Sequence, residues 1–242
     1  MRTALMSVIG IAVVYGHFSF AFADDSDEEK LRNALKVLLP DVEVTSVSPS
    51  PVNGLYEIML GPDVVYMTAD GRYVMRGDLL DLKQRRNLSE EKRAQGRIDV
   101  LNSMALDDMI EFAPKDTKHT VYVFTDVDCT YCRKLHREMS VLNANGIAVR
   151  YLAFPRAGIG SSTYKKMVSV WCADDRNKAL TDAKAGRAIE TKSCEAPVKE
   201  QYKLGQLMGV RGTPAIVLET GQELPGYVPA KELVKLLNGN QN

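Results

Sequence analysis

The 242-residue sequence has little histidine, cysteine or tryptophan, and it has no excess of charge of either sign. It contains three histidines, four cysteines and one tryptophan, and its 31 basic residues are balanced by 31 acidic ones. This balance gives no electrostatic reason to expect a nucleic-acid partner. With no second Cys-x-x-Cys and so few histidines, a structural zinc site would lack ligands. We therefore expect neither nucleic acid nor a metal ion as a ligand.

After the first residues, long apolar runs are also absent. No stretch in that part of the chain approaches the roughly 18 apolar residues of a membrane-spanning helix. At the start, Arg2 precedes an apolar run from Ala4 to Val14. Ala21-Phe22-Ala23 then has the small-x-small form of a signal-peptidase site. An uncleaved anchor is the competing interpretation, but the run is short for one. We expect residues 1–23 to be a signal peptide, cleaved after Ala23, and the rest to be exported to the periplasm.

Residues 24–84 have the pattern of a small α+β domain. Leucines recur at helical spacing at Leu31, Leu35 and Leu38. Strand-like runs follow at 55–60 and 64–68, and Asp70-Gly71 predicts a tight hairpin in which both central residues have positive φ. A unit of this size buries too little surface to be comfortably stable alone, so its open sheet edges suggest pairing with a second copy. The sequence thus suggests a dimerisation domain.

Residues 85–113 are predicted to form a linker helix. Apolar residues recur there at steps of three and four, as Ile98, Leu101, Ala105 and Met109. Asn87, with Glu90 three residues later, fits a helix start, and Pro114 limits the end. The run 83–97 carries six basic and two acidic residues. We interpret it as a solvated helix face and not as a nucleic-acid patch.

Residues 114–242 show an α/β alternation typical of a separate domain. The predicted elements are a buried strand at 119–124, a helix after Cys129 that ends near Gly146, a strand at 147–154, a mainly helical insertion at 161–194, a helix at 198–208, a hairpin of 215–219 with 223–228, and a last helix from Pro229.

The chemistry of the sequence centres on Cys129-Thr130-Tyr131-Cys132, which follows the predicted strand and opens the next helix. The N–H groups and the dipole of a helix N-terminus favour a thiolate at Cys129, which makes it the expected nucleophile. Cys132 begins a buried helical stripe and is better placed to resolve a mixed disulfide. His136 lies on the same helix, and we interpret it as a residue at the polar edge, not as a group that tunes the thiolate.

The other two cysteines, Cys172 and Cys194, enclose a segment within the predicted helical insertion. Neither belongs to a Cys-x-x-Cys, so the sequence favours a structural disulfide over a second redox centre. Closing such a loop contributes about 3 kcal/mol in the chain-entropy model. Gly212-Thr213-Pro214 precedes a predicted strand, which by itself is a weak signal because an ordinary trans proline is common there.

Several stretches together carry a family resemblance. They are Tyr66–Gly71 and Gly77 in the front part, and Phe124–Cys132, Lys134–His136, Tyr151–Arg156, Trp171–Ala173 and Gly212–Ala215 in the rest. Through them the sequence resembles, over essentially its whole length, the DsbC family of periplasmic disulfide isomerases. The resemblance implies an α+β protein: a small cystatin-like dimerisation domain, a linker helix and a thioredoxin-fold catalytic domain with a helical insertion.

The resemblance also implies how the site works. Cys129 attacks and Cys132 resolves, while Pro214 is a cis-proline beside them, with Thr213 before it. Together with these two, Thr130 and Tyr131 are expected to contact the client protein. The family forms V-shaped homodimers with an apolar cleft and chaperone activity, acts on misoxidised or unfolded exported proteins, and is kept reduced by DsbD, an inner-membrane reductase. No cofactor is expected beyond the redox-active disulfide of Cys129 and Cys132.

One departure leaves alternatives open. Thr130 stands where the family motif typically has glycine, and the residues between the cysteines tune redox poise in this superfamily. A reductase of sulfenylated cysteines with a narrower client set, similar to the DsbG relatives, is therefore a second hypothesis. A third is a binding module that holds unfolded chains in the cleft and in which the cysteines are secondary.

Overall fold

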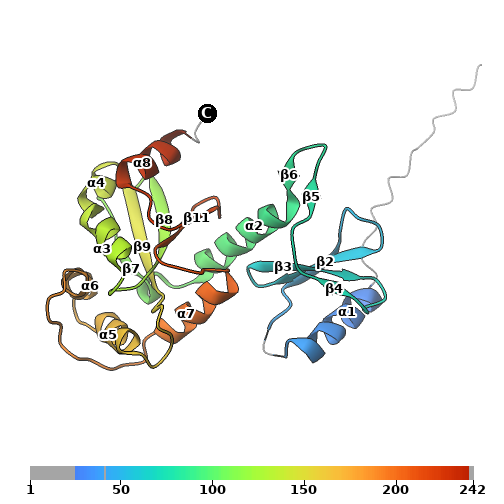
Figure 1. Cartoon of the computed structure of the whole chain (residues 1–242), viewed down its shortest axis with the longest axis horizontal. Coiled ribbons are helices and arrows are strands. Elements are labelled where there is room, and N and C mark those ends of the chain that lie inside the picture. The colour runs from blue at the N-terminus through green and yellow to red at the C-terminus, as the bar shows by residue number, and fades with distance from the viewer. Residues whose placement is uncertain (1–24, 41, 240–242) are drawn as a thin grey trace, which may run out of the picture.

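The computed structural model describes residues 25–40 and 42–239, which form two units joined by a long helix (Figure 1). The predicted signal peptide and its cleavage site lie outside the described residues. Within the described ranges, no helix is both long enough and apolar enough to cross a membrane.

The N-terminal unit packs one helix against a small antiparallel sheet. It consists of α1 (Asp25–Leu38), β1 (Ser46–Pro49), β2 (Leu55–Leu60), β3 (Asp63–Thr68) and β4 (Val74–Met75), with strand order β1-β2-β3-β4. The predicted helix and strands are confirmed. Leu31 and Leu35 are fully buried against Ile58 and Met67, whereas Leu38, at the end of α1, is 64% exposed. The apolar face of α1 thus covers one face of the sheet.

The turn between β3 and β4 differs from the predicted two-residue hairpin. Only Gly71 has positive φ there, at +73°, and Asp70 does not, so that part of the prediction is wrong. The ladder resumes at Val74, and the Asp70 carboxylate accepts hydrogen bonds from the Thr68 hydroxyl and the Arg72 N–H. The first of these contacts also lowers the pKa of Asp70. A side-chain turn therefore replaces the second left-handed residue.

The connecting helix is shorter than predicted. After the two-stranded arm of β5 (Leu80–Asp81) and β6 (Arg86–Asn87), helix α2 runs over Leu88–Ser103. The Asn87 side chain accepts from the N–H of Glu90 at 3.0 Å, which confirms the predicted cap. The prediction of helix to residue 113 is wrong. A 3₁₀ turn, η1 (Leu106–Asp108), and a strand, β7 (Ile110–Phe112), follow instead, because residues 110–112 pair with residues 149–151 of the large sheet.

The C-terminal unit surrounds a five-stranded sheet of order β11-β10-β8-β9-β7. Its other elements are β8 (His119–Thr125), α3 (Thr130–Arg137), α4 (Met139–Ala144), β9 (Ile147–Ala153), α5 (Ser162–Trp171), α6 (Arg176–Lys184), α7 (Val198–Leu207), β10 (Ala215–Leu218), β11 (Glu223–Pro225) and α8 (Ala230–Gly239). Only β8 and β9 are parallel. This arrangement confirms the predicted α/β unit with a helical insertion, α5–α6.

The two faces of this sheet bury different cores because side chains alternate along a strand. Val121 and Val123 of β8 face a cluster that includes Leu135, Trp171 and Leu233 from helices α3, α5 and α8. The intervening β8 residues, Tyr122 and Phe124, join Leu101 of α2 and Met208 beyond α7 on the other face. Helix α2 therefore contributes to the core of the C-terminal unit.

Two close approaches fix α2 between the units. At Gly96, a Cβ atom would lie 2.9 Å from the Met59 side chain and 3.0 Å from the Pro62 backbone, so only glycine lets the helix reach the β2–β3 turn. At Gly221, in the β10–β11 turn, a Cβ would overlap the Ala94 carbonyl at 1.9 Å. Arg97, which is 3% exposed, donates to the Gly221 carbonyl at 2.7 Å. Both units thus pack against helix α2.

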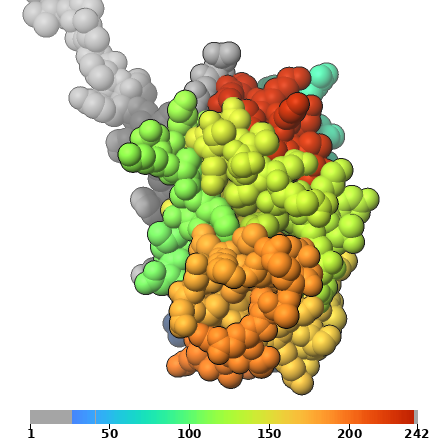
Figure 2. All heavy atoms as spheres, turned by 90° about the vertical axis from the view of Figure 1, so that its left-hand side faces the viewer, coloured from blue at the N-terminus to red at the C-terminus, as the bar shows by residue number. Residues whose placement is uncertain are grey.

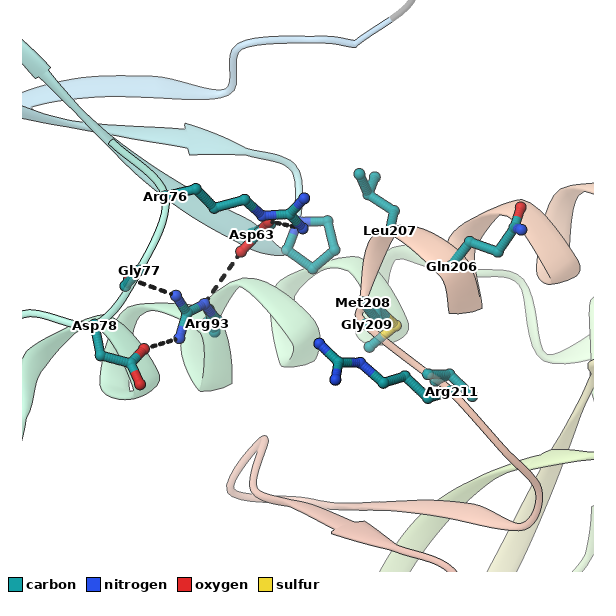
Figure 3. Close-up of a pocket in the computed structure, with 12 residues that line it drawn as sticks. Asp63, Arg76, Gly77, Asp78, Arg93, Gln206, Leu207, Met208, Gly209 and Arg211 are labelled. Carbon is teal, nitrogen blue, oxygen red and sulfur yellow. Dashed lines mark hydrogen bonds and ion pairs between the residues drawn. The ribbon is translucent and has the colours of Figure 1, made fainter. Parts of the chain in front are cut away.

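A cluster of ion pairs anchors α2 on the N-terminal unit (Figure 3). The Arg93 guanidinium donates to the carboxylates of Asp63 at 3.1 Å and Asp78 at 2.6 Å, and to the Gly77 carbonyl at 2.8 Å. Arg76 donates to the second oxygen of Asp63 at 2.7 Å. A cavity of about 750 Å³ separates this cluster from the segment 206–211 of the C-terminal unit.

The Arg93 cluster leads to a stability prediction. Replacing Arg93 by methionine removes three charge-assisted contacts and leaves the mostly buried Asp63 carboxylate with Arg76 as its one ion-pair partner. We expect the free energy of unfolding to fall by about 2 kcal/mol, as for hydrogen bonds to charged groups. Urea denaturation followed by circular dichroism measures it. The matched change at exposed Lys83, Lys83→Met, should stay within about 0.5 kcal/mol. Equal effects of the two substitutions would contradict the anchoring role of Arg93.

Candidate active site

The two cysteines of the Cys-x-x-Cys motif lie where β8 gives way to α3. The strand ends at Thr125, the loop 126–128 turns the chain, and Cys129 occupies the N-cap position of α3, with extended backbone angles. The Cys129 N–H donates to the Asp126 carbonyl at 3.2 Å, which closes the turn. Cys132 is the third residue of the helix. One sulfur therefore stands before the free N–H groups of the helix and the other lies within its first turn.

The surroundings of Cys129 favour its thiolate form. A hydrogen bond with the Cys132 thiol is the largest of several effects that lower the pKa of Cys129 to about 5. Burial opposes this shift, whereas Thr213, the backbone N–H of Cys132 and the positive charge of Arg156 add to it. Only 2% of the residue is exposed. Because the thiolate is the attacking species in disulfide exchange, this sulfur is prepared for nucleophilic attack.

Cys132 has the opposite character. It is 1% exposed, and burial raises the pKa of its thiol, which the hydrogen bond to Cys129 raises further. The two sulfurs are not bonded to each other, so the structure represents the dithiol form. A neutral thiol beneath a thiolate donates to it, and the pair shares one negative charge located mainly on Cys129.

Thr213 and Pro214 lie against the cysteines from the neighbouring strand. Ala215 pairs with Phe124, which sets the preceding residues beside the end of β8. The Thr213–Pro214 peptide bond is cis, and the Thr213 carbonyl oxygen lies 3.2 Å from the Cys129 sulfur. The Thr213 hydroxyl is buried, and this side chain lowers the pKa of both cysteines.

Two aspartates fix the loop between β8 and α3. Buried Asp126 accepts from the Asp128 N–H at 2.7 Å and from the backbone and guanidinium of Arg156 at 3.0 and 3.2 Å. Asp128 accepts from Lys166 at 2.7 Å and Thr163 at 2.8 Å. Burial alone would raise the pKa of Asp128, but these contacts lower it overall. The loop is thus tied to α5 and to the segment after β9.

The residues between the cysteines face outward. Thr130 is exposed, and Tyr131 is 59% exposed, with its ring stacked on Tyr227 at a centroid distance of 6.1 Å. The ammonium nitrogen of Lys134 lies over the ring of Tyr227, 4.5 Å from its centroid. Thr130 and Tyr131 are therefore accessible to a client, while Thr213 and Pro214 form the floor beside the sulfur. Contact of these four residues with a client stays a prediction.

His136 is buried and does not lie at a polar edge, so that interpretation is wrong. Its two ring nitrogens lie 3.1 Å from the Tyr151 hydroxyl and 3.0 Å from the Thr181 hydroxyl, and it is 8% exposed. Burial, followed by the nearby charge of Lys184, lowers the pKa of His136 to about 4. It is neutral at physiological pH. This burial could not be predicted from the sequence, because a distant segment, α6 of the insertion, covers His136 through Thr181.

Lys184 is a residue near the site that the sequence reasoning missed. It ends α6, is 3% exposed, and interacts electrostatically with both active-site cysteines. The sequence indicates the burial of Lys184 only weakly, through its position four residues after Leu180 on the buried face of the same helix.

The insertion that carries Lys184 is closed by a disulfide. Cys172 caps α5 and is bonded to Cys194, with Cα atoms 5.7 Å apart. Ser169 accepts from the Lys192 N–H and donates to its carbonyl, which holds the returning segment against α5. Figure 2 shows this insertion, in gold and orange, filling the lower part of one face below α3 and α4.

No cluster of three or more potential metal ligands occurs among residues 25–40 and 42–239. The site described above consists of the two sulfurs, the cis-proline segment and the charged groups around them. Its chemistry is that of a low-pKa thiolate next to a protonated thiol.

The asymmetry of the two thiols predicts a pH profile. We expect iodoacetamide to alkylate Cys129 with a midpoint near pH 5, because an acid whose pKa is lowered is ionised above that pH. In the Cys132→Ala variant the midpoint should rise, since the largest lowering contact is lost. Mass spectrometry of the modified peptide measures both. A midpoint near the ordinary value of about 8.5 in the unmodified chain would contradict activation of Cys129.

Two family models match the chain, one for each unit. The disulfide bond isomerase protein N-terminal domain matches residues 21–90, and a thioredoxin-like domain matches residues 106–240. Among solved structures, a disulfide interchange protein from Neisseria gonorrhoeae is similar, with a TM-score of 0.52 and 32% identity, covering 57% of this chain and 99% of that one. The fold of the C-terminal unit is therefore the thioredoxin fold.

Curated relatives are similar along nearly the whole chain. The thiol:disulfide interchange protein DsbC of Salmonella typhimurium is 39% identical over 242 residues, covering 100% of this chain and 98% of that protein. DsbC of Escherichia coli is 37% identical over 222 residues, covering 92% and 91%. Together with the two matched domains and the thiolate–thiol pair at the start of α3, these relatives show that the chain belongs to the DsbC family of periplasmic disulfide isomerases, which act by thiol–disulfide exchange.

Proposed function

We propose that this chain rearranges incorrect disulfides in exported proteins through Cys129 and Cys132. The observation that carries the proposal is the pairing of a buried thiolate with a protonated thiol at one helix start. The Cys129 thiolate attacks a client disulfide, so that one client sulfur leaves as a thiolate and the other is bonded to Cys129. A different client thiolate then displaces Cys129, which completes the rearrangement without net oxidation.

Cys132 supplies the second outcome. When no client thiol returns, Cys132 displaces the client from Cys129, and the enzyme is left oxidised with a Cys129–Cys132 disulfide while the client is reduced by two electrons. We propose that a DsbD-type inner-membrane reductase restores the dithiol, and that no cofactor other than this disulfide takes part. Thr130, between the cysteines, sets part of the balance between isomerisation and oxidation.

Each part of the chain has its own proposed role. We propose that residues 1–23 direct export and are removed after Ala23, that residues 24–84 form the dimerisation domain, and that the catalytic domain begins with β7. The clients are misoxidised or unfolded proteins. They would contact Thr130, Tyr131, Thr213 and Pro214 around the sulfur, and the space between two paired chains would give the protein its chaperone activity.

Exposed apolar residues support a homodimer formed through the N-terminal unit. β4 is an edge strand, and its two residues, Val74 and Met75, are 44% and 45% exposed, while Tyr73 just before it is 57% exposed. Leu80 and Leu82 in the adjoining arm are 54% and 84% exposed. A contiguous apolar edge with unpaired backbone groups is suited to pairing with the same edge of a second copy.

Refolding of scrambled ribonuclease tests the proposed activity. We expect the purified mature chain, in a glutathione buffer, to restore ribonuclease activity, and the Cys129→Ala variant to restore none, because the attacking sulfur is absent. If neither protein restores it, the narrower reductase is favoured, and reduction of a sulfenylated client protein then identifies it. If both proteins suppress aggregation of an unfolded client equally and neither refolds ribonuclease, the binding module is the function.

A charge placed on the β4 edge tests the dimer. The Val74→Asp substitution should convert the dimer to a monomer, because burying an unpaired carboxylate in an apolar interface is unfavourable. Light scattering after size-exclusion chromatography measures the mass. The matched control is Val52→Asp, at a residue that is 41% exposed in the turn between β1 and β2, which are not neighbours of β4 in the sheet. A Val74→Asp protein that stays dimeric would exclude this edge as the interface.

A further inference from the structure

Lys184 is an unusual residue within the C-terminal unit. Its side chain is buried, with 3% of the residue exposed, and its ammonium nitrogen donates to the Thr125 hydroxyl at 2.6 Å. The same nitrogen lies 5.1 Å from the centre of the Tyr151 ring. No carboxylate of the described residues lies within ion-pair distance of it. Lysine is almost never fully buried without such a partner, so a structural role in an ion pair does not explain this one.

The charged and titratable groups around Lys184 are those of the active site. They are Asp126 in the loop after β8, Cys129 at the N-cap of α3, Cys132, Arg133 and His136 on α3, and Tyr151 on β9. Burial lowers the pKa of Lys184 to about 8, Cys132, Cys129 and Asp126 oppose that shift, and Arg133 adds to it. Lys184 therefore exchanges its proton near physiological pH, where an ordinary lysine stays charged.

His136 and Tyr151 are poor candidates for proton exchange at this place. Burial lowers the pKa of His136 to about 4, so the ring is a weak base. Burial raises the pKa of Tyr151, so its hydroxyl keeps its proton. The Asp126 carboxylate is already paired with Arg156. Of His136, Tyr151 and Lys184, Lys184 is thus the base whose pKa suits a transfer near neutral pH.

The chemistry of Cys132 requires such a base. Before Cys132 can attack a mixed disulfide on Cys129, its thiol must lose a proton. Cys132 is 1% exposed, which leaves bulk water little access to it. In the mixed disulfide, the Cys129 sulfur carries no charge and no longer accepts the Cys132 proton. The proton must therefore pass to a protein group.

We propose that Lys184 accepts the proton of Cys132 during resolution of the mixed disulfide, an inference that rests on the proposed function. The neutral amine takes the proton and becomes an ammonium, and the Cys132 thiolate attacks the Cys129 sulfur. The Cys129–client S–S bond breaks as the Cys129–Cys132 bond forms. The client sulfur leaves as a thiolate and takes a proton from solvent. The two cysteines lose two electrons and the client disulfide gains them.

The ammonium that results from the transfer also favours the Cys132 thiolate, because its positive charge lowers the pKa of that thiol. Thr125 keeps the amine in place through the hydrogen bond at 2.6 Å. Since Thr125 is the last residue of β8 and Cys129 starts the next helix, the same strand end holds both the nucleophile and the proton acceptor.

Rapid mixing of the reduced mature chain with oxidised glutathione, acid quenching and mass spectrometry separate the two steps. The mixed disulfide on Cys129 appears during attack and disappears during resolution. In the Lys184→Met variant, whose side chain is also unbranched and fits a buried site, resolution at pH 7 should slow by about 10²-fold, the lower end of what a positioned proton acceptor contributes. The rise of its rate near pH 8 should disappear. Lys178→Met, at an exposed residue of the same helix, should leave both steps unchanged.

Attack by Cys129, measured with Cys132 intact as the rate at which the mixed disulfide appears, should change less than about twofold in Lys184→Met, since a thiol with a pKa near 5 stays ionised at pH 7. Equal slowing of attack and resolution, with the pH profile kept, would mean a structural role and overturn the proposal. Recovery of the resolution rate in Lys184→Arg would overturn it too, because arginine keeps its proton.

A titration of the unmodified chain does not depend on any variant folding. The ¹³Cε resonance of Lys184, assigned from its loss in Lys184→Met, should titrate near pH 8 in the reduced protein. A lysine that stays protonated to pH 10 would overturn the proposal. If the unmodified chain forms no mixed disulfide on Cys129, the proposed function is wrong as well. If it does form one and only the effect of Lys184→Met is missing, the role of Lys184 alone is wrong.

Discussion

The structure of the active site depends on one electrostatic constraint, which is that two adjacent sulfurs in a dry site cannot both be charged. Cys129 stands before the first turn of α3, where N–H groups and Arg156 stabilise an anion. Cys132 lies one turn further in, where burial keeps its proton on the sulfur. The hydrogen bond between them links the two states, because the proton that Cys132 keeps is the one that lowers the pKa of Cys129. Activation of the nucleophile is therefore a property of the pair and not of the helix end alone.

The rest of the C-terminal unit serves to hold that pair in place. The pairing of β10 with β8 brings the Thr213 carbonyl to the Cys129 sulfur, and Asp126 and Asp128 fix the intervening loop through Arg156 and Lys166. Helix α2 is shared by both units through Gly96, Arg97 and Leu101. An N-terminal unit that pairs with a second copy would thus set the position of the active site through a single helix.

Features that depend on a few neighbouring residues were predictable from the sequence, and features that depend on packing between distant segments were not. Leucine spacing in α1, the Asn87 cap and the placement of Cys129 at a strand-to-helix turn are local, and the structure has each of them. The extent of the linker helix was predicted wrongly because residues 110–112 form strand β7, which pairs with β9 of the large sheet. The turn at Asp70 was also predicted wrongly, because its carboxylate, and not a second positive φ, stabilises the chain reversal.

The most consequential feature that the sequence did not predict is the role of the helical insertion at the active site. From the sequence, the insertion was expected only to be closed by a structural disulfide. Helix α6 contributes Thr181 to His136 and Lys184 to Thr125, so the insertion covers the inner side of α3. Without that cover, Cys132 would be exposed to solvent, and burial would no longer raise the pKa of its thiol. Cys129 would then lose the hydrogen-bond donor that lowers its pKa most. The insertion is therefore part of the redox site. Its disulfide, by holding the segment after α6 to α5, restricts unfolding of the layer that keeps the two sulfurs unequal.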